Sequence, residues 1–139
     1  MAGERTRRWG LTSEQWSKFG DLIRFGFWAG TAALLAALLV PQADLPQLPA
    51  SDKIEHVVAF AIVSLLAGLA YRRAVALRLA LVLIVGGAVV EIVQAMMPYG
   101  RTGDPKDAIA DLLGVALGMS IAFLLTRLLR IVKLPALAK

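Results

Sequence analysis

The sequence lacks cysteine altogether and has a single histidine in 139 residues. Without cysteine, the chain forms no disulfide, no thiolate metal site and no thiol nucleophile. One histidine also disfavours a zinc site, so we expect neither a metal nor another cofactor, with an oxygen-ligated Mg²⁺ or Ca²⁺ left open. Charged residues amount to only 18%, and we find no internal repeat or low-complexity segment.

Apolar residues are abundant instead. They make up 58% of the chain and give a mean hydropathy of +0.70, whereas soluble domains contain about 45–50%. A soluble chain of this length has no core large enough to hide so much apolar surface, so lipid is the expected solvent. The isoelectric point near 10.1 does not indicate a nucleic-acid partner, because the basic residues lie at the ends of apolar segments and not in one patch.

Four apolar segments are each close to the roughly 20 residues that span a bilayer as a helix. Backbone polar groups in lipid must be satisfied within the segment, and the alternating pattern of a membrane β-barrel is absent. The sequence therefore predicts an all-α, polytopic membrane protein whose four helices form a single domain over residues 1–139. The expected spans are about 22–40, 54–71, 77–97 and 107–131.

The distribution of Lys and Arg predicts the orientation of these spans. When the four segments are threaded through a bilayer, all but three of the fifteen basic residues fall on one side, the exceptions being Lys53, Arg101 and Lys106. Cytoplasmic loops carry the excess of positive charge, so both termini are expected in the cytoplasm. The expected location is the bacterial cytoplasmic (inner) membrane.

Residues 1–21 precede the first span and are expected to form a cytoplasmic amphipathic segment. Apolar residues, Trp16 among them, recur there at helical spacing. Thr12 and Gln15 have the spacing of a capping box, which marks a helix start. We therefore expect a short helix lying on the membrane surface, separate from the first span.

Polar residues interrupt the other three segments on the side away from the termini. An ionisable group inside a span costs roughly 2.5–3.5 kcal/mol at mid-bilayer, so such residues need a partner or a function. Glu91 and Gln94 share a helix face, and Asp111 lies one turn after Asp107. The sequence predicts that these groups meet in one polar pocket. Its expected lining residues are Asp52, Lys53, His56, Glu91, Gln94, Arg101, Asp107 and Asp111.

Structural explanations compete with a functional one for some acidic residues. Asp52 and Glu55 have the spacing of an N-cap residue and its capping-box partner. Asp104 fits an N-cap, followed by Pro105 at the first helical position. Glu91 and Gln94 are open to a structural interpretation as a pair hydrogen-bonded to another helix. Asp111 lies a full turn deeper in its segment than Asp107, so capping does not account for it.

Glycine spacing predicts where helices pack closely. Two glycines four residues apart share one helix face, and their lack of a side chain lets a second helix approach. The stripe that continues from Asp111 is therefore open to a second interpretation, as a packing seam only. The glycines predicted to pack helices are Gly114, Gly118, Gly26 and Gly30.

The polar spacings resemble those of the VanZ-like family of bacterial membrane proteins. The similarity covers about residues 50–120 and consists of Asp52-Lys53-x2-His56-x3-Phe60, Glu91-x2-Gln94 and Arg101-x5-Asp107-x3-Asp111-x2-Gly114-x3-Gly118. The chain departs from the family pattern at Asp111, where an Asn is usual. The resemblance implies a small polytopic protein, and the family's namesake is associated with low-level resistance to the glycopeptide antibiotic teicoplanin.

Three classes of function are compatible with these residues. The first is a binding or modulating protein of the cell envelope that engages an amphiphile from the outer leaflet, either a lipid-linked wall precursor or a glycopeptide. The second is a lipid-headgroup hydrolase or transferase that uses His56 and carboxylates as acid and base. The third is a small helical subunit or assembly factor with a membrane-protein partner. We favour the first, because the expected pocket has no obvious nucleophile apart from carboxylates and Thr102.

Overall fold

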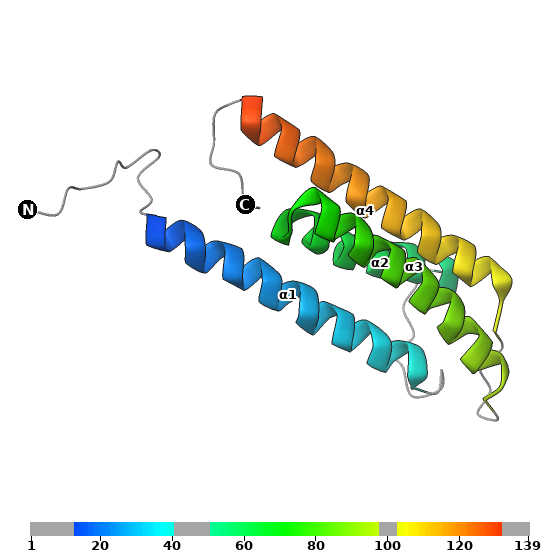
Figure 1. The fold of residues 1–139 in the computed structure, drawn as a ribbon. Coiled ribbons are helices and arrows are strands. Elements are labelled where there is room, and N and C mark those ends of the chain that lie inside the picture. The colour runs from blue at the N-terminus through cyan, green and yellow to red at the C-terminus, as the bar shows by residue number, and fades with distance from the viewer. Residues whose placement is uncertain (1–12, 41–50, 98–102, 132–139) are drawn as a thin grey trace, which may run out of the picture.

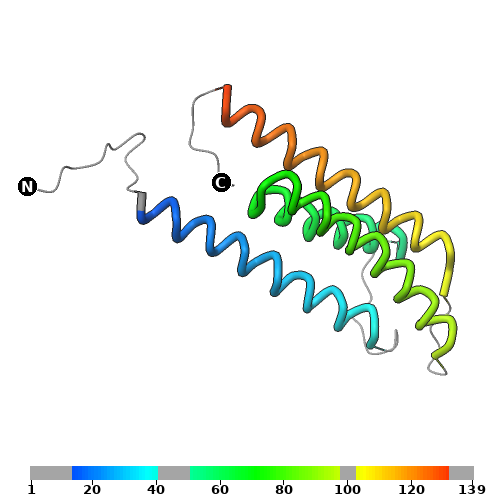
Figure 2. Tube along the Cα trace, viewed as in Figure 1, coloured from blue at the N-terminus to red at the C-terminus, as the bar shows by residue number. Residues whose placement is uncertain are grey.

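The computed structural model describes residues 13–40, 51–97 and 103–131, and most of these residues are helical. The helices are α1 (Ser13–Leu39), α2 (Asp52–Ala70), α3 (Arg73–Ala95) and α4 (Pro105–Ile131). Each is long and apolar enough to cross a bilayer. The predicted all-α fold with four spans is confirmed, and the helices lie side by side in one elongated bundle (Figure 1, Figure 2).

The first helix is longer than the sequence predicts. It runs without a break from Ser13 to Leu39, so the residues expected to form a separate surface helix are the first turns of α1. No proline interrupts this range, and an i,i+4 ion pair of 2.8 Å between Glu14 and Lys18 favours a helix there. The prediction of a separate interfacial helix is wrong for the described residues, and Thr12 lies outside them.

The centre of the bundle is the contact between α2 and α4, which is the most extensive of any helix pair. A methyl group at Gly114 would lie 2.5 Å from the carbonyl oxygen of Val57. A methyl group at Gly118 would overlap the carbonyl oxygen of Ala61. The two backbones therefore approach this closely only because both positions lack a side chain, which places the predicted glycine seam between α2 and α4.

Helix α1 packs at the edge of the bundle, mainly against α2. Methyl groups at Gly26 and Gly30 would make only ordinary contacts, 3.8 Å from Leu66 Cδ1 and 3.6 Å from Val63 Cγ2. Both glycines therefore face α2, but a methyl group would fit at either position, so the approach of α1 to α2 does not depend on them. Instead α1 is anchored by Phe27, which is 1% exposed.

Large apolar side chains cover the outside of the bundle. Val82, Ile92 and Leu124 are each more than half exposed, and they belong to a surface rich in such residues. A surface of this kind in water would lead to aggregation, whereas in a bilayer it contacts acyl chains. Buried charge inside such a bundle is therefore the feature that calls for an explanation.

The two ends of the bundle differ in charge. Helix α1 begins and α4 ends at one end, where the turn between α2 and α3 also lies (Figure 1). We call this the basic end; its arginines include Arg72, Arg73, Arg127 and Arg130. At the opposite end α2 and α4 begin and α3 finishes. We call it the acidic end; its carboxylates include Asp52, Glu91, Asp104, Asp107 and Asp111.

Candidate functional site

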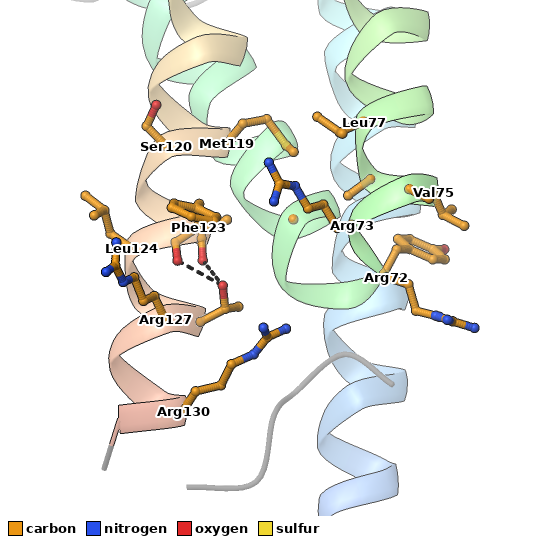
Figure 3. Close-up of a pocket in the computed structure, with 16 residues that line it drawn as sticks. Arg72, Arg73, Val75, Leu77, Met119, Ser120, Phe123, Leu124, Arg127 and Arg130 are labelled. Carbon is orange, nitrogen blue, oxygen red and sulfur yellow. Dashed lines mark hydrogen bonds between the residues drawn. The ribbon is translucent and has the colours of Figure 1, made fainter. Parts of the chain in front are cut away.

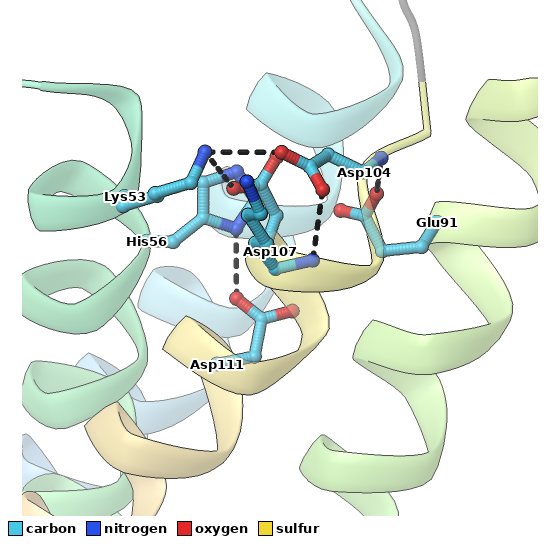
Figure 4. Close-up of polar contacts among 7 residues, drawn as sticks. Lys53, His56, Glu91, Asp104, Asp107 and Asp111 are labelled. Carbon is cyan, nitrogen blue, oxygen red and sulfur yellow. Dashed lines mark hydrogen bonds and ion pairs between the residues drawn. The ribbon is translucent and has the colours of Figure 1, made fainter.

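Four of the residues expected in a polar pocket are buried together at the acidic end. His56 is 7% exposed, Glu91 7%, Asp107 5% and Asp111 1%. They come from three helices, α2, α3 and α4, and their side chains point toward a shared region between these helices (Figure 4). Residues far apart in the sequence therefore form one cluster, which we call the acidic-end cluster.

A short hydrogen bond joins α2 to α4 in this cluster. His56 Nδ1 lies 2.7 Å from Asp111 Oδ1, and both residues are almost fully buried. The two atoms share one hydrogen, and which of them donates depends on the tautomer of the imidazole and on the protonation of the carboxyl group. Asp111 thereby fixes the orientation of the imidazole ring.

The second oxygen of Asp111 has no hydrogen-bond partner among the described residues, although it is fully buried. It lies against α3 at Gly87, where a methyl group would come within 2.5 Å of it. Gly87 thus makes the space that this oxygen occupies. A buried carboxylate oxygen without a partner is costly, which marks the position as one where a further polar atom belongs.

Lys53 ties the start of α2 to the start of α4. Its Nζ lies 3.1 Å from Asp104 Oδ2 and 3.2 Å from Asp107 Oδ1 (Figure 4). Asp107 Oδ1 is buried and makes no well-aligned hydrogen bond, so attraction between opposite charges holds this contact. Because the Lys53 side chain is 46% exposed, it lies at the mouth of the cluster and can reach a ligand outside.

Asp104 caps α4, as the sequence predicts. Its Oδ1 accepts a hydrogen bond of 2.9 Å from the backbone amide of Lys106. Its own amide donates to Glu91 Oε2 at 3.0 Å, which joins α4 to α3. The Lys106 amide, and after it the Lys53 ammonium group, lower the pKa of the Asp104 carboxyl below its usual value. The sequence did not reveal that a capping residue also connects three helices.

The capping box predicted at the start of α2 is wrong. The N-cap residue is Ser51, its side chain makes no capping hydrogen bond, and Asp52 is the first residue of the helix. The chain becomes helical one residue earlier than expected, because the Ser51 carbonyl already accepts the amides of Ile54 and Glu55. Asp52 is exposed, at the helix N-terminus where negative charge is favourable.

Gln94 has a different contact from the one expected. It is buried, and its Nε2 donates a hydrogen bond of 2.6 Å to the backbone carbonyl of Leu38. The last carbonyls of a helix have no partner within the helix, so Gln94 satisfies one of them at the end of α1. Gln94 therefore links α3 to α1. Arg101, also expected in the pocket, lies outside the described residues.

Two sets of side chains in the described part of the chain are close enough to hold a metal ion. One consists of Asp52, His56 and Asp107, and the other of His56, Glu91 and Asp111; within each set the candidate ligand atoms lie within 4.8 Å of one another. The second set is entirely buried. One imidazole and two carboxylates suit a divalent metal such as Zn²⁺, Mn²⁺ or Fe²⁺. The count of histidines alone did not suggest this geometry.

Asp104 both caps α4 and carries a negative charge, and two substitutions distinguish these contributions to stability. A carboxyl with a lowered pKa contributes stability that is fully present above its unfolded value, here 3.8, and is lost as the pH falls through the lower folded value. Asp104→Asn keeps a capping oxygen but removes the charge, and Asp104→Ala removes both. We expect thermal unfolding in detergent between about pH 3 and 7 to show a smaller acid-induced loss of stability for Asp104→Asn than for the wild type. Asp104→Ala should be the least stable at neutral pH. Equal acid-induced losses in wild type and Asp104→Asn would contradict this assignment.

Four bilayer-length helices, three of which bury a histidine–carboxylate cluster at one end, define a polytopic membrane protein. The chain belongs to the VanZ/LLP1 family, whose model matches residues 4–126. The match includes parts of all four helices, so it extends beyond the segment that carries the resemblance in the sequence. No protein of curated function and no solved structure shows significant similarity to the chain. The function must therefore be argued from the site itself.

Proposed function

We propose that this protein is a component of the bacterial cell envelope that binds an amphiphile through the acidic-end cluster. The single observation that carries the proposal is Asp111 Oδ2, a fully buried carboxylate oxygen without a partner among the described residues. The neighbouring groups come from three helices, so a ligand atom placed there would contact α2, α3 and α4 at once. Expected ligands are a lipid-linked wall precursor or a glycopeptide antibiotic, as in a teicoplanin-resistance role.

The charge distribution supports an outward-facing cluster in the cytoplasmic membrane. Most Lys and Arg residues lie at the basic end or in the segments leading to it, and such residues remain on the cytoplasmic side of a membrane protein. The acidic end then faces outward. An amphiphile in the outer leaflet would place its polar head at the depth of His56 and Glu91, with its chains in the surrounding lipid.

The cluster contains more acids than bases, and this limits the chemistry of the ligand. Lys53 compensates Asp104 and Asp107, whereas Glu91 and Asp111 have no lysine or arginine within ion-pair distance in the described part of the chain. A cationic group on a ligand fits there directly. A phosphate group fits only when a divalent cation or a proton lies between it and the two carboxylates.

Glu91→Gln tests the binding role. The amide oxygen of Gln still accepts from the Asp104 amide, so the link between α3 and α4 is retained while the charge is lost. We expect purified wild type to bind a synthetic lipid-linked muropeptide or teicoplanin. Glu91→Gln should bind the same probe about tenfold to a hundredfold more weakly, the usual effect of losing a charged hydrogen bond.

Glu55→Gln is the matched control, because it removes a carboxylate at the same end that makes no side-chain hydrogen bond or ion pair with the cluster residues. Its affinity should equal that of wild type. The comparison requires that both variants retain the thermal stability of wild type. Two results would reject the proposal: wild type that binds neither probe, or a folded Glu91→Gln variant that binds as tightly as wild type.

The hydrogen bond between His56 and Asp111 favours one alternative, a metal-assisted hydrolase or transferase acting on a lipid headgroup. Of the groups present, His56 would act as the acid or base and Asp111 would orient it. Equilibrium dialysis against Mg²⁺, Mn²⁺ or Zn²⁺ tests the metal requirement, and Asp111→Asn should lower the affinity by removing a charge from the buried set. Undetectable binding of all three ions would exclude the metal-assisted version, and absence of turnover of a labelled lipid precursor would exclude the enzyme.

A further inference from the structure

A groove opens at the basic end, on the opposite side of the molecule from the acidic-end cluster. It lies between the turn that joins α2 to α3 and the last turns of α4, and it has a volume of about 1190 Å³ (Figure 3). Neither the resemblance to a family nor the proposed function assigns anything to this surface. We call it the basic-end groove.

The groove combines apolar walls with a cationic rim. Leu77, Met119 and Leu124 contribute to its walls, while Arg73, Arg127 and Arg130 line it from two helices. Figure 3 shows the Arg73 side chain directed toward α4, where its guanidinium carbon lies 5.4 Å from the centre of the Phe123 ring. Arginine therefore approaches the groove from both α3 and α4.

These arginines have no carboxylate partner among the described residues. The described acids of α1 near this end, Glu14 and Asp21, pair with Lys18 and Arg24. The remaining described acids lie at the acidic end or in its first helical turns. Arg73, Arg127 and Arg130 consequently present unbalanced positive charge around the basic-end groove.

We propose that the basic-end groove binds an anionic phospholipid of the adjacent leaflet. Guanidinium groups match the geometry of a phosphate, to which they can donate two parallel hydrogen bonds. Basic pockets between spanning helices on the cytoplasmic side are suited to anionic lipid headgroups. The apolar walls favour a lipid over free phosphate, because they provide contact for the acyl chains.

Basic residues at this end also direct membrane orientation, and this general role makes a different prediction. Orientation depends on the number of Lys and Arg residues near the spans and not on the groove. Arg78 provides the comparison: it is an exposed arginine in the second turn of the same helix as Arg73, but it does not line the groove. If the arginines only set orientation, substitution of Arg73 and of Arg78 should have the same effect. If the groove binds a lipid, only substitution of Arg73 should weaken binding.

The test measures lipid selectivity of the full chain. Wild type is reconstituted in nanodiscs that contain equal amounts of phosphatidylglycerol and phosphatidylcholine. The protein is then released into detergent, and native mass spectrometry identifies the lipids that remain bound. We expect retained phosphatidylglycerol in wild type. Arg73→Gln and Arg130→Gln should each reduce its preference over phosphatidylcholine about fivefold, as expected for one basic residue near an anionic lipid. Arg78→Gln should leave the preference unchanged.

Four outcomes would overturn the proposal. The first is that wild type shows no preference for phosphatidylglycerol. The second is that Arg78→Gln reduces the preference as much as Arg130→Gln. The third is that inorganic phosphate displaces the lipid, which would assign the site to a soluble anion. The fourth is lipid binding only after removal of residues 132–139, which would assign the groove to the chain's own C-terminal segment. Thermal unfolding confirms that each variant is folded, and Arg73→Gln and Arg130→Gln serve as independent tests if one of them fails to fold.

Discussion

Gly118→Ala is expected to lower the free energy of unfolding by about 3 kcal/mol, the upper part of the range for overpacking a core. The added methyl group would overlap the carbonyl oxygen of Ala61 and the hydroxyl of Ser64, and it would also crowd the backbone amide of Leu65. A serine side chain can rotate, but backbone atoms move only if α2 and α4 separate. Since these two helices form the centre of the bundle, their separation weakens the whole fold.

Gly86→Ala is the matched control for this variant, because a methyl group there has no neighbour within 4 Å among the described residues. Gly86 is also helical and faces a more open environment, so Gly86→Ala should leave stability unchanged or raise it slightly through the better helix propensity of alanine. Reversible unfolding in mixed detergent micelles measures both variants. Equal stabilities of the two variants would contradict the close approach of α2 and α4 at Gly118.

The second large effect is expected at His56. His56→Ala leaves Asp111 buried with neither oxygen hydrogen-bonded by a described residue. Removing one partner of a buried pair typically costs about 3–5 kcal/mol, and we expect about 3 kcal/mol here. Asp111→Ala should cost less, because it also removes the oxygen that already lacks a partner.

A double-mutant cycle separates the contact between the two residues from the effects of each substitution alone. The double variant His56→Ala with Asp111→Ala should be more stable than the sum of the single losses predicts, by a coupling energy of about 2 kcal/mol. Ser120→Ala is the control partner: it lies further along α4, roughly 13 Å from Asp111 along the helix axis. His56→Ala and Ser120→Ala should be additive within about 0.5 kcal/mol. Additivity of His56→Ala and Asp111→Ala would show that the hydrogen bond between them is absent.

Much of the fold follows from the sequence, because the thickness of a bilayer fixes the length of an apolar helix. Helices α2, α3 and α4 begin a few residues before the expected spans, because each helix extends from the apolar segment into polar flanking residues such as Arg73. Helices α2 and α3 end slightly earlier than expected. The extent of α1 was missed for a related reason. Periodicity indicates that residues 13–21 are helical, but it does not indicate whether a bend separates them from the span.

The convergence of polar residues could also be predicted, because depth in the membrane is a simple function of position along each helix. The rotation of a helix about its own axis does not follow from position in the same way, so it cannot be predicted from the sequence alone. Gln94 shares a helix face with Glu91, which predicts that it lines the same pocket, yet it contacts Leu38 of α1. The sequence contains no direct signal for which neighbouring helix a buried amide will face.

Gly87 is a sequence signal for the cluster that the spacing of the polar residues does not include. It lies four residues before Glu91 and therefore on the same face of α3, and the space left by its missing side chain accommodates Asp111 Oδ2. The basic-end groove had no comparable signal. Its volume depends on how a turn and a helix end are placed in space, and only the packed structure provides that placement.

The measurement that tests the central claim most directly is an experimental density map of the protein in a lipid environment, at a resolution that shows side chains and bound molecules. We predict that His56, Glu91 and Asp111 surround one shared volume, with ordered density for an ion or a ligand headgroup within hydrogen-bonding or coordination distance of Asp111 Oδ2. A map in which these three side chains face separate surroundings would contradict the account. So would a map in which a side chain of the protein itself satisfies that oxygen.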